Sequence, residues 1–168
     1  MTPLTDMVFS ATTLSAGSAL SVVSKKVGSN TYAGIQPKTQ ISTLDRDNAV
    51  TAVLTVPKGM TAKATKFTLR GTKIGTDGGL IAVGVQYGDG EETIVKKDVV
   101  VARDNAAGTS VAVEEFPDQT ITSDNPLYIR VYVYGLGNTK QLGLRNFLLY
   151  GTWEGTSGGV ETCMFKAE

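Results

Sequence analysis

The chain has 168 residues, 16 basic and 16 acidic side chains, one Cys and no His. Without His the chain cannot form a Ser-His-Asp triad or a Cys-His pair, and with a single Cys it cannot form an intrachain disulfide or an ordinary structural zinc site. A formal net charge of zero also argues against a nucleic-acid binder, which normally carries an excess of Lys and Arg.

The first 37 residues differ in composition from the rest. They are rich in Ser, Thr, Ala and Gly and sustain neither helical nor strand periodicity. We interpret residues 1–37 as an extended N-terminal arm, with short edge strands near residues 7–12 and 19–27. Such a segment buries little of itself, so it must lie along its own domain, lie along a neighbour, or stay mobile. Residues 38–168 are expected to form one β-sandwich domain.

Period-two alternation, which is typical of half-buried strands, recurs at fairly even spacing after the arm. The eight stretches that show it are residues 39–44, 50–56, 64–74, 80–87, 93–101, 109–116, 127–134 and 144–153. No window of about 11 residues or more keeps a helical apolar stripe, so little helix is expected. The pattern predicts an all-β, antiparallel β-sandwich of jelly-roll type, with an immunoglobulin-like sandwich as the alternative.

The clearest strand is the stretch Leu127–Tyr134, in which aliphatic residues alternate with aromatic and charged ones. Tyr and Arg are enriched at protein interfaces. We therefore predict that the aromatic and charged residues of this strand form a candidate interaction surface, whose rings could also stack on sugars. The alternative is that the other sheet covers this face and leaves a two-sided core strand. The surface consists of Tyr128, Arg130, Tyr132 and Tyr134.

Motifs that resemble catalytic or phosphate-binding sites are incomplete. Gly155–Gly159 spells Gly-x-Ser-x-Gly, but no helical pattern follows it and no His exists to activate the Ser. The Gly135-Leu136-Gly137 turn lacks the third glycine of a dinucleotide-binding loop, because Lys140 stands at that position. We therefore predict no catalytic residues and no enzyme.

Metal and thiol chemistry are also not expected. Asp77, Asp89, Glu91 and Glu92 could offer oxygen ligands to Ca²⁺, but the EF-hand spacing is absent and acidic hairpin tips are ordinarily solvated. We predict no metal site and no cofactor. Cys163 is interpreted as a small hydrophobic residue near the C-terminus.

Charge is distributed unevenly along the chain. Residues 1–76 hold nine Lys or Arg and three Asp or Glu, and residues 77–168 hold seven and thirteen. Either the two halves interleave in one sandwich, or the molecule has a basic and an acidic face suited to docking. Within the basic half, Lys66 and Arg70 would share a strand face if no bulge intervenes, and Lys63 and Lys73 would share the other. We expect these to be solvated faces rather than a docking stripe.

Features that would direct the chain to a membrane or out of the cell are not visible. No apolar run approaches the roughly 20 residues of a membrane span. The first six residues lack the basic and apolar regions of a signal peptide. We expect synthesis in a host cytoplasm without a signal peptide.

An extended small-residue arm, eight short strands, no His, no signal peptide and no visible active site together resemble the small jelly-roll decoration, or cement, proteins of tailed-bacteriophage heads. The resemblance is architectural and covers residues 38–153 and the arm, and no individual family residue is carried over. It implies a non-enzymatic virion structural protein, a dimer or trimer on the outer capsid surface. Its partners would be the major capsid protein and copies of itself, with the arm reaching a neighbour.

The alternative is a carbohydrate-binding β-sandwich module, alone or within a receptor-binding fibre. That function would require an exposed, coplanar aromatic platform. The candidates are the tyrosines of the interaction surface and Trp153.

Overall fold

The computed structural model describes residues 5–11, 16–75, 78–155 and 164–167. These residues form two antiparallel β-sheets packed face to face, and the all-β antiparallel sandwich predicted from the sequence is confirmed. The described elements are β1 (Thr5–Ala11), β2 (Leu20–Val27), β3 (Asn30–Pro37), a 3₁₀ turn η1 (Arg46–Asn48), β4 (Ala49–Thr55), β5 (Met60–Ile74), β6 (Leu80–Tyr87), β7 (Thr93–Val99), β8 (Thr109–Val113), β9 (Leu127–Tyr134), β10 (Gln141–Gly155) and β11 (Met164–Ala167).

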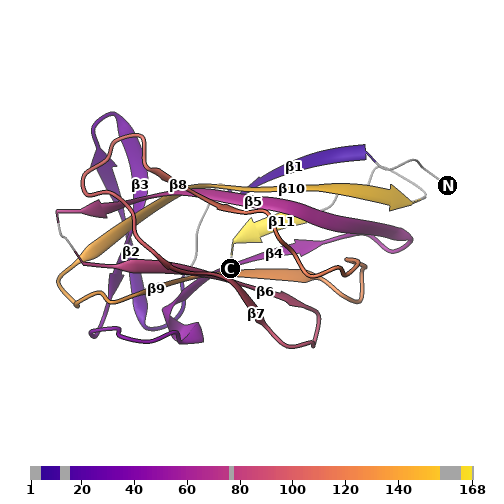
Figure 1. The fold of residues 1–168 in the computed structure, drawn as a ribbon, viewed down its shortest axis with the longest axis horizontal. Coiled ribbons are helices and arrows are strands. Elements are labelled where there is room, and N and C mark those ends of the chain that lie inside the picture. Colours follow the sequence, from indigo (N-terminus) through magenta and orange to yellow (C-terminus); the bar gives the residue numbers. More distant parts are fainter. Residues whose placement is uncertain (1–4, 12–15, 76–77, 156–163, 168) are drawn as a thin grey trace.

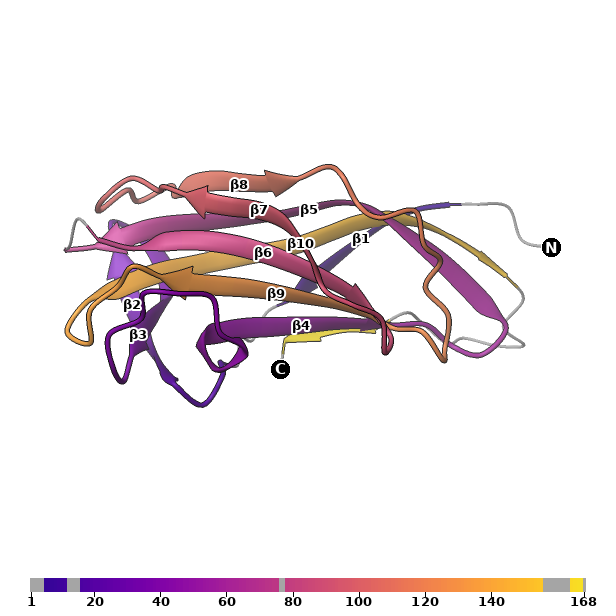
Figure 2. The same ribbon diagram turned by 60° about the horizontal axis from the view of Figure 1, so that its bottom comes forward.

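One sheet, here called the β10 sheet, has the strand order β2-β3-β10-β5-β8, and β1 also pairs with β10. The other, the β9 sheet, has the order β11-β4-β9-β6-β7. Most strands run along the long axis, whereas the β2–β3 hairpin crosses it steeply near one end (Figure 1). Figure 2 shows β7 and β8 along one side of the sandwich and β4 and β11 along the opposite side.

The strand pairing is nested in the manner of a jelly roll. Of the eight consecutive strands β3 to β10, the first pairs with the last, and the remaining pairs are β4 with β9, β5 with β8, and β6 with β7. A long antiparallel hairpin of eight strands has thus rolled into two sheets. The jelly-roll prediction is confirmed, but the roll begins at β3 rather than at residue 39.

The expected boundary at residue 37 does not separate an arm from the sandwich. Residues 20–37 form the β2–β3 hairpin, and β3 pairs with β10 in the sheet. The hairpin contributes five buried side chains, Leu20, Val27, Tyr32, Ile35 and Pro37. In the described part of the chain, β1, which pairs with the second half of β10, is the only strand before this hairpin, and residues 16–19 bond to η1 and the start of β4.

The sequence prediction also differs from the structure at residues 39–44. In place of a strand, Ile41 makes a single two-bond bridge with Leu136. The remaining seven predicted stretches correspond to β4 through β10, with ends that shift by a few residues. Strand β3 was not predicted because Asn, Gly and Pro, which are rare in strands, occupy positions 30, 34 and 37. Strand β11 was also not predicted.

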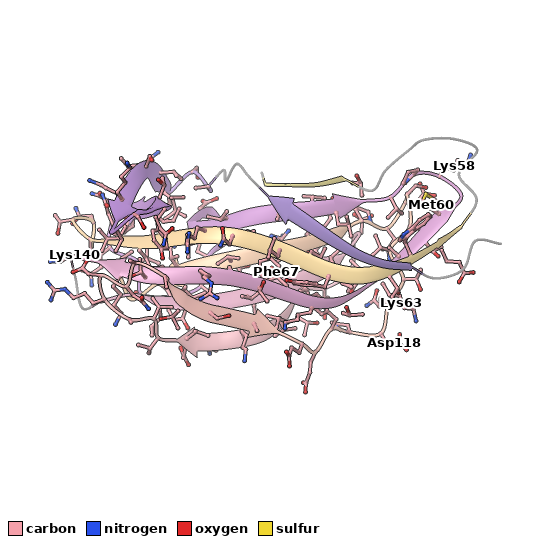
Figure 3. All side chains as sticks on the ribbon, turned by 90° about the horizontal axis from the view of Figure 1, so that it is seen from above. Lys58, Met60, Lys63, Phe67, Asp118 and Lys140 are labelled. Atoms are coloured by element: carbon pink, nitrogen blue, oxygen red, sulfur yellow. The ribbon has the colours of Figure 1, made fainter. Side chains whose placement is uncertain are left out.

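The core lies between the two sheets. Alternate residues of β9, from Leu127 to Val133, have no exposed surface, and they face Phe67 and Phe147 from β5 and β10. These two rings meet edge to face, with centroids 5.5 Å apart, and Figure 3 shows Phe67 in the middle of the sandwich. Each such side chain contributes roughly 1.5–3 kcal/mol through burial. The core therefore fixes which face of every strand points outward.

In the described part of the chain, no helix is long and apolar enough to cross a membrane.

Candidate functional site

The predicted interaction surface lies on the side of β9 that faces away from the β10 sheet, because its residues alternate with the fully buried ones. On either side β9 is bordered by β4 and β6. Tyr132 pairs with Ala49 and Ala82, and Arg130 pairs with Thr51 and Gly84. Mostly small neighbours therefore surround the two large polar side chains.

Two of the four residues of this predicted surface are buried in the structure. Tyr132 and Tyr134 are only 3% and 6% exposed, whereas Tyr128 and Arg130 are half-buried. The Tyr132 hydroxyl donates to the Glu92 carboxylate at 2.6 Å, and the Tyr134 hydroxyl donates to the Asp98 carboxylate at 2.6 Å. An open row of three tyrosines is therefore not present. The residues that cover it come from β7 and the loop before β7, not from the other sheet.

Glu92 lies at the centre of a polar cluster, which we call the Glu92 network. Its carboxylate accepts a bond from Tyr132 and forms a 2.8 Å ion pair with Arg130. Arg130 also donates to the Gln86 side-chain oxygen at 2.8 Å, and the Gln86 amide donates to the Gly88 carbonyl. The side chains of Arg130 and Glu92 are only 11% and 14% exposed. The network therefore ties the β6–β7 hairpin to the outer face of β9.

Gly84 makes this arrangement possible. A Cβ atom at this position would lie 2.7 Å from the Glu92 side-chain carboxyl carbon. The missing side chain leaves the space that the carboxylate occupies beside Arg130. Neither Gln86 nor Gly84 was singled out by the sequence analysis, since an isolated Gly and a Gln in a strand carry no specific signal.

Burial and hydrogen bonding keep the two covered tyrosines neutral. The pKa of Tyr132 is raised to about 12, chiefly by burial and next by the hydrogen bond to Glu92 and its charge, against a lowering effect of Arg130. Burial, followed by the bond to Asp98, raises the pKa of Tyr134 to about 12. At neutral pH both hydroxyls are donors and not bases. The network fits a structural role rather than acid–base chemistry.

The acidic residues considered as Ca²⁺ ligands are not gathered into a site. Glu92 is already bound to Arg130 and Tyr132, while Asp89 and Glu91 are exposed near the tip of the hairpin. Among the residues that the structure describes, no group of three or more His, Cys, Asp or Glu side chains could hold a metal ion. Asp77, Cys163 and most of the Gly155–Gly159 motif lie outside those residues.

The basic residues of β5 lie differently from the predicted pattern. Lys63 and Lys66 pair with Thr152 and Tyr150, which are two residues apart on β10, so both lysines share the outer face. A bulge at Thr65 causes this shift. Lys63 forms an ion pair with Asp118 at 3.0 Å, and Figure 3 shows the two side by side.

The two oppositely charged halves of the chain interleave. Each sheet contains strands from both halves. Besides the Lys63–Asp118 pair, Lys66 lies 3.5 Å from Glu114. Both pairs join the basic half of the sequence to the acidic half. For these residues the two halves therefore interleave in one sandwich and do not form separate basic and acidic faces.

A second polar cluster, which no sequence pattern indicated, fixes the loop of residues 105–108 to the outer face of the β10 sheet. The Tyr32 hydroxyl donates to the carbonyls of Asn105 and Ala106, at 3.1 and 2.8 Å. Arg70 donates to the Gly108 carbonyl at 3.0 Å, and Arg145 donates to the Ala107 carbonyl at 3.1 Å. Donors from β3, β5 and β10 therefore hold this loop, which leads into β8, the third strand from β3 in the sheet order.

Exposed apolar side chains concentrate at the edges of the two sheets. On β2, at the edge of the β10 sheet, Val22 and Val23 are 39% and 44% exposed. On the opposite side of the sandwich, Ile94 of β7 and Val100, directly after β7, are also exposed. Trp153, by contrast, packs against the core and does not form an open platform.

No family model matches the sequence, and no curated protein matches it either. Two solved structures are similar over most of the chain. A xylan-binding domain from CBM 22 is 13% identical, with a TM-score of 0.34 over 88% of this chain and 89% of that one. A family two carbohydrate esterase from Cellvibrio japonicus is 13% identical, with a TM-score of 0.29 over 92% of this chain. The chain spans 35% of the esterase's length. Likeness at these TM-scores carries no argument about function.

Proposed function

We propose that the protein is a non-enzymatic structural protein of a virion, a decoration or cement protein that bridges capsid subunits on the outer surface of a phage head. The supporting observation is the distribution of exposed apolar residues. Val22 and Val23 lie on one lateral edge of the sandwich, and Ile94 and Val100 lie on the opposite edge. Exposed apolar residues at two opposite edges would let one molecule contact two neighbouring capsid subunits at once.

Multivalency explains how such modest edges could stabilise a particle. Each edge presents only two large apolar side chains, so a single contact would be weak. Many copies attached to one lattice convert later contacts into effectively intramolecular ones, and their effects add. The partners under this proposal are the major capsid protein and further copies of the chain.

The test is attachment to heads of the virus whose genome encodes the chain. Purified protein is mixed with undecorated heads, and the bound fraction is measured by sedimentation. We expect the wild-type chain to bind and to raise the temperature at which the heads open. The double variant Val22→Lys/Val23→Lys and the double variant Ile94→Lys/Val100→Lys should each bind more weakly, because a desolvated Lys is costly at an apolar contact.

The control is Thr61→Lys/Thr65→Lys, which adds the same two charges at exposed positions of β5, a strand in the interior of the β10 sheet. It should bind like the wild type. No binding by the wild-type chain, or equal binding by all three variants, would contradict the proposal.

The second candidate, carbohydrate binding, is favoured by a smaller observation. The half-buried Tyr128 ring lies beside Arg130, whose guanidinium carbon is 5.7 Å from the ring centroid, and Arg46 reaches Gln86 at 3.4 Å nearby. An aromatic ring surrounded by planar polar side chains could bind a single sugar unit by stacking and hydrogen bonding. Under this candidate, Tyr128→Ala should abolish binding on a glycan array while Tyr150→Ala, on the other sheet, should not. An array without any bound glycan would exclude it.

A further inference from the structure

Strand β2 is a long, regular edge strand. It pairs with β3 in unbroken register from Leu20 opposite Pro37 to Val27 opposite Asn30, and Gly28-Ser29 forms the two-residue turn. Gly28 has a φ of +62°, as the first central position of a type II′ turn requires. Every side chain from Ser21 to Lys26 is exposed, on both faces of the strand. No described strand pairs with its outer edge.

The edge strands β7, β8 and β11 carry features that discourage pairing with a second molecule. Strands β8 and β11 have only 5 and 4 residues. Strand β7 pairs with β6 through two register irregularities, and its Asp98 has a φ of +56°. Short length, bulges and charge are the usual protections of sheet edges. Strand β2 has eight residues, no Pro and no register shift, and its first five residues are uncharged. It is therefore an edge open to strand addition.

The distribution of charge along β2 favours one partner and one orientation. Lys25 and Lys26 lie at one end of the strand, and the uncharged Leu20–Ser24 segment lies at the other. A second copy of β2 in antiparallel orientation would place its lysines beside the uncharged segment, so that like charges do not face each other. A parallel copy in register would place lysine against lysine, which is destabilising.

We propose that β2 is a self-association edge, at which two copies of the chain pair their β2 strands antiparallel about a two-fold axis near Val23. The pairing buries Val22 and Val23 of both copies and joins the two β10 sheets into one continuous sheet. The contact is isologous, as in most symmetric dimers. The hairpin crosses the sandwich steeply near one end (Figure 1), so the proposed axis lies at that end of each molecule. This inference deepens the proposed structural function by naming a partner and a mode of contact, but its test needs no capsid.

The first measurement is the solution mass of the full chain by light scattering over a range of concentrations. We expect a concentration-dependent shift from the 17.7 kDa chain to twice that mass. Val22→Lys/Val23→Lys should remain a monomer, with an unchanged circular dichroism spectrum as evidence of folding. Ile94→Lys/Val100→Lys, at the opposite edge, should still dimerise. A wild-type chain that stays monomeric up to about 1 mM, the weak end of measurable association, would overturn the inference.

The second measurement tests the geometry. In a Cys163→Ser background, Val23→Cys places one thiol per chain at the proposed axis, where antiparallel neighbours are close enough for a disulfide. Mild oxidation should yield a covalent dimer quickly. Val100→Cys, which is more exposed, is the matched control and should cross-link slowly. Equal rates for the two variants would contradict pairing at β2.

The two proposals can fail separately. A monomer in solution that still binds heads would overturn self-association at β2 and leave the structural function standing. A β2-linked dimer that does not bind heads would support the inference and contradict the proposed function.

Discussion

Glu92 bonds to Arg130 and Tyr132, two residues of the predicted interaction surface on β9. Alternation along β9 places Arg130 and Tyr132 on one outer face, and this much follows from sequence. The covering residue comes from the β6–β7 hairpin, 38 and 40 positions away in sequence. No local pattern reveals a contact over such a separation. The face of each residue was therefore predictable, while its exposure was not.

The Glu92 network predicts a stability loss for Glu92→Gln. The substitution removes the negative charge beside Arg130, whose side chain is only 11% exposed, and leaves that cation without a counter-charge. We expect a loss of about 2–3 kcal/mol in the free energy of unfolding, measured with urea. The matched control is Glu91→Gln at the exposed neighbouring position, which should cost no more than about 0.5 kcal/mol. Equal losses for the two variants would show that the ion pair does not stabilise the fold.

The raised tyrosine pKa values predict a loss of stability in alkali. The pKa of Tyr132 rises from the ordinary value of 10.0 to about 12 in the folded state. Between these values the unfolded chain loses the Tyr132 proton while the folded chain keeps it. Stability is thus unaffected below pH 10 and falls as pH rises toward 12. Tyr132→Phe should make this fall less steep, whereas Tyr150→Phe on the other sheet should not. Unfolding curves at a series of pH values provide the measurement, and identical slopes in all three proteins would contradict the assignment.

At the scale of strands, the alternation pattern located β4 through β10 but not their irregularities. The bulge at Thr65 brings Lys63 to the face of Lys66, because one extra residue reverses the side of every residue on one flank. Strand β3 escaped prediction for a different reason. Its Gly34 lies where a Cβ would come within 3.0 Å of the Lys25 side chain and the Val23 carbonyl, so packing against β2 requires a residue that lowers strand propensity.

Gly84 allows the β6 strand and the Glu92 network to coexist, which predicts the effect of Gly84→Ala. The new Cβ would lie 2.7 Å from the Glu92 carboxyl carbon, so the flexible Glu92 side chain must move away from Arg130. We expect a loss of about 2 kcal/mol in urea unfolding, the value of a hydrogen bond to a charged group. Gly137→Ala, where the nearest atom is 3.7 Å away, should cost much less.

A double-mutant cycle tests the mechanism of this loss. If Gly84→Ala acts by displacing Glu92, its cost should largely disappear in the Glu92→Gln background, because both changes remove the same ion pair. Additive costs would instead indicate that the alanine strains β6 itself.

For the molecule as a whole, composition and periodicity predicted the sandwich architecture correctly but placed the start of the sandwich domain too late, after residue 37. The eight-strand count led to a jelly roll, and the nested pairing of β3 to β10 has that arrangement. The eight predicted stretches were nevertheless shifted, since residues 39–44 were counted in place of β3. The alternation in β3 is weak, and this strand pairs with β10, which lies far away in sequence. A pairing over such a distance cannot be read from a short stretch of sequence.

The position of β3 predicts where the chain can be shortened. A chain that begins at Lys38 lacks the first strand of the roll and, besides Pro37, four large buried side chains, Leu20, Val27, Tyr32 and Ile35. At roughly 1.5–3 kcal/mol each, their loss amounts to about 6–12 kcal/mol, comparable with the whole stability of about 5–15 kcal/mol for a typical domain. We expect this truncated chain not to fold. A chain that begins at Ala16 loses β1 but keeps all eight strands of the roll, and it should unfold cooperatively on heating. If the Lys38 chain also unfolds cooperatively, with a near-native circular dichroism spectrum, then the β2–β3 hairpin is an accessory to the sandwich and the arm boundary expected at residue 37 is the correct one.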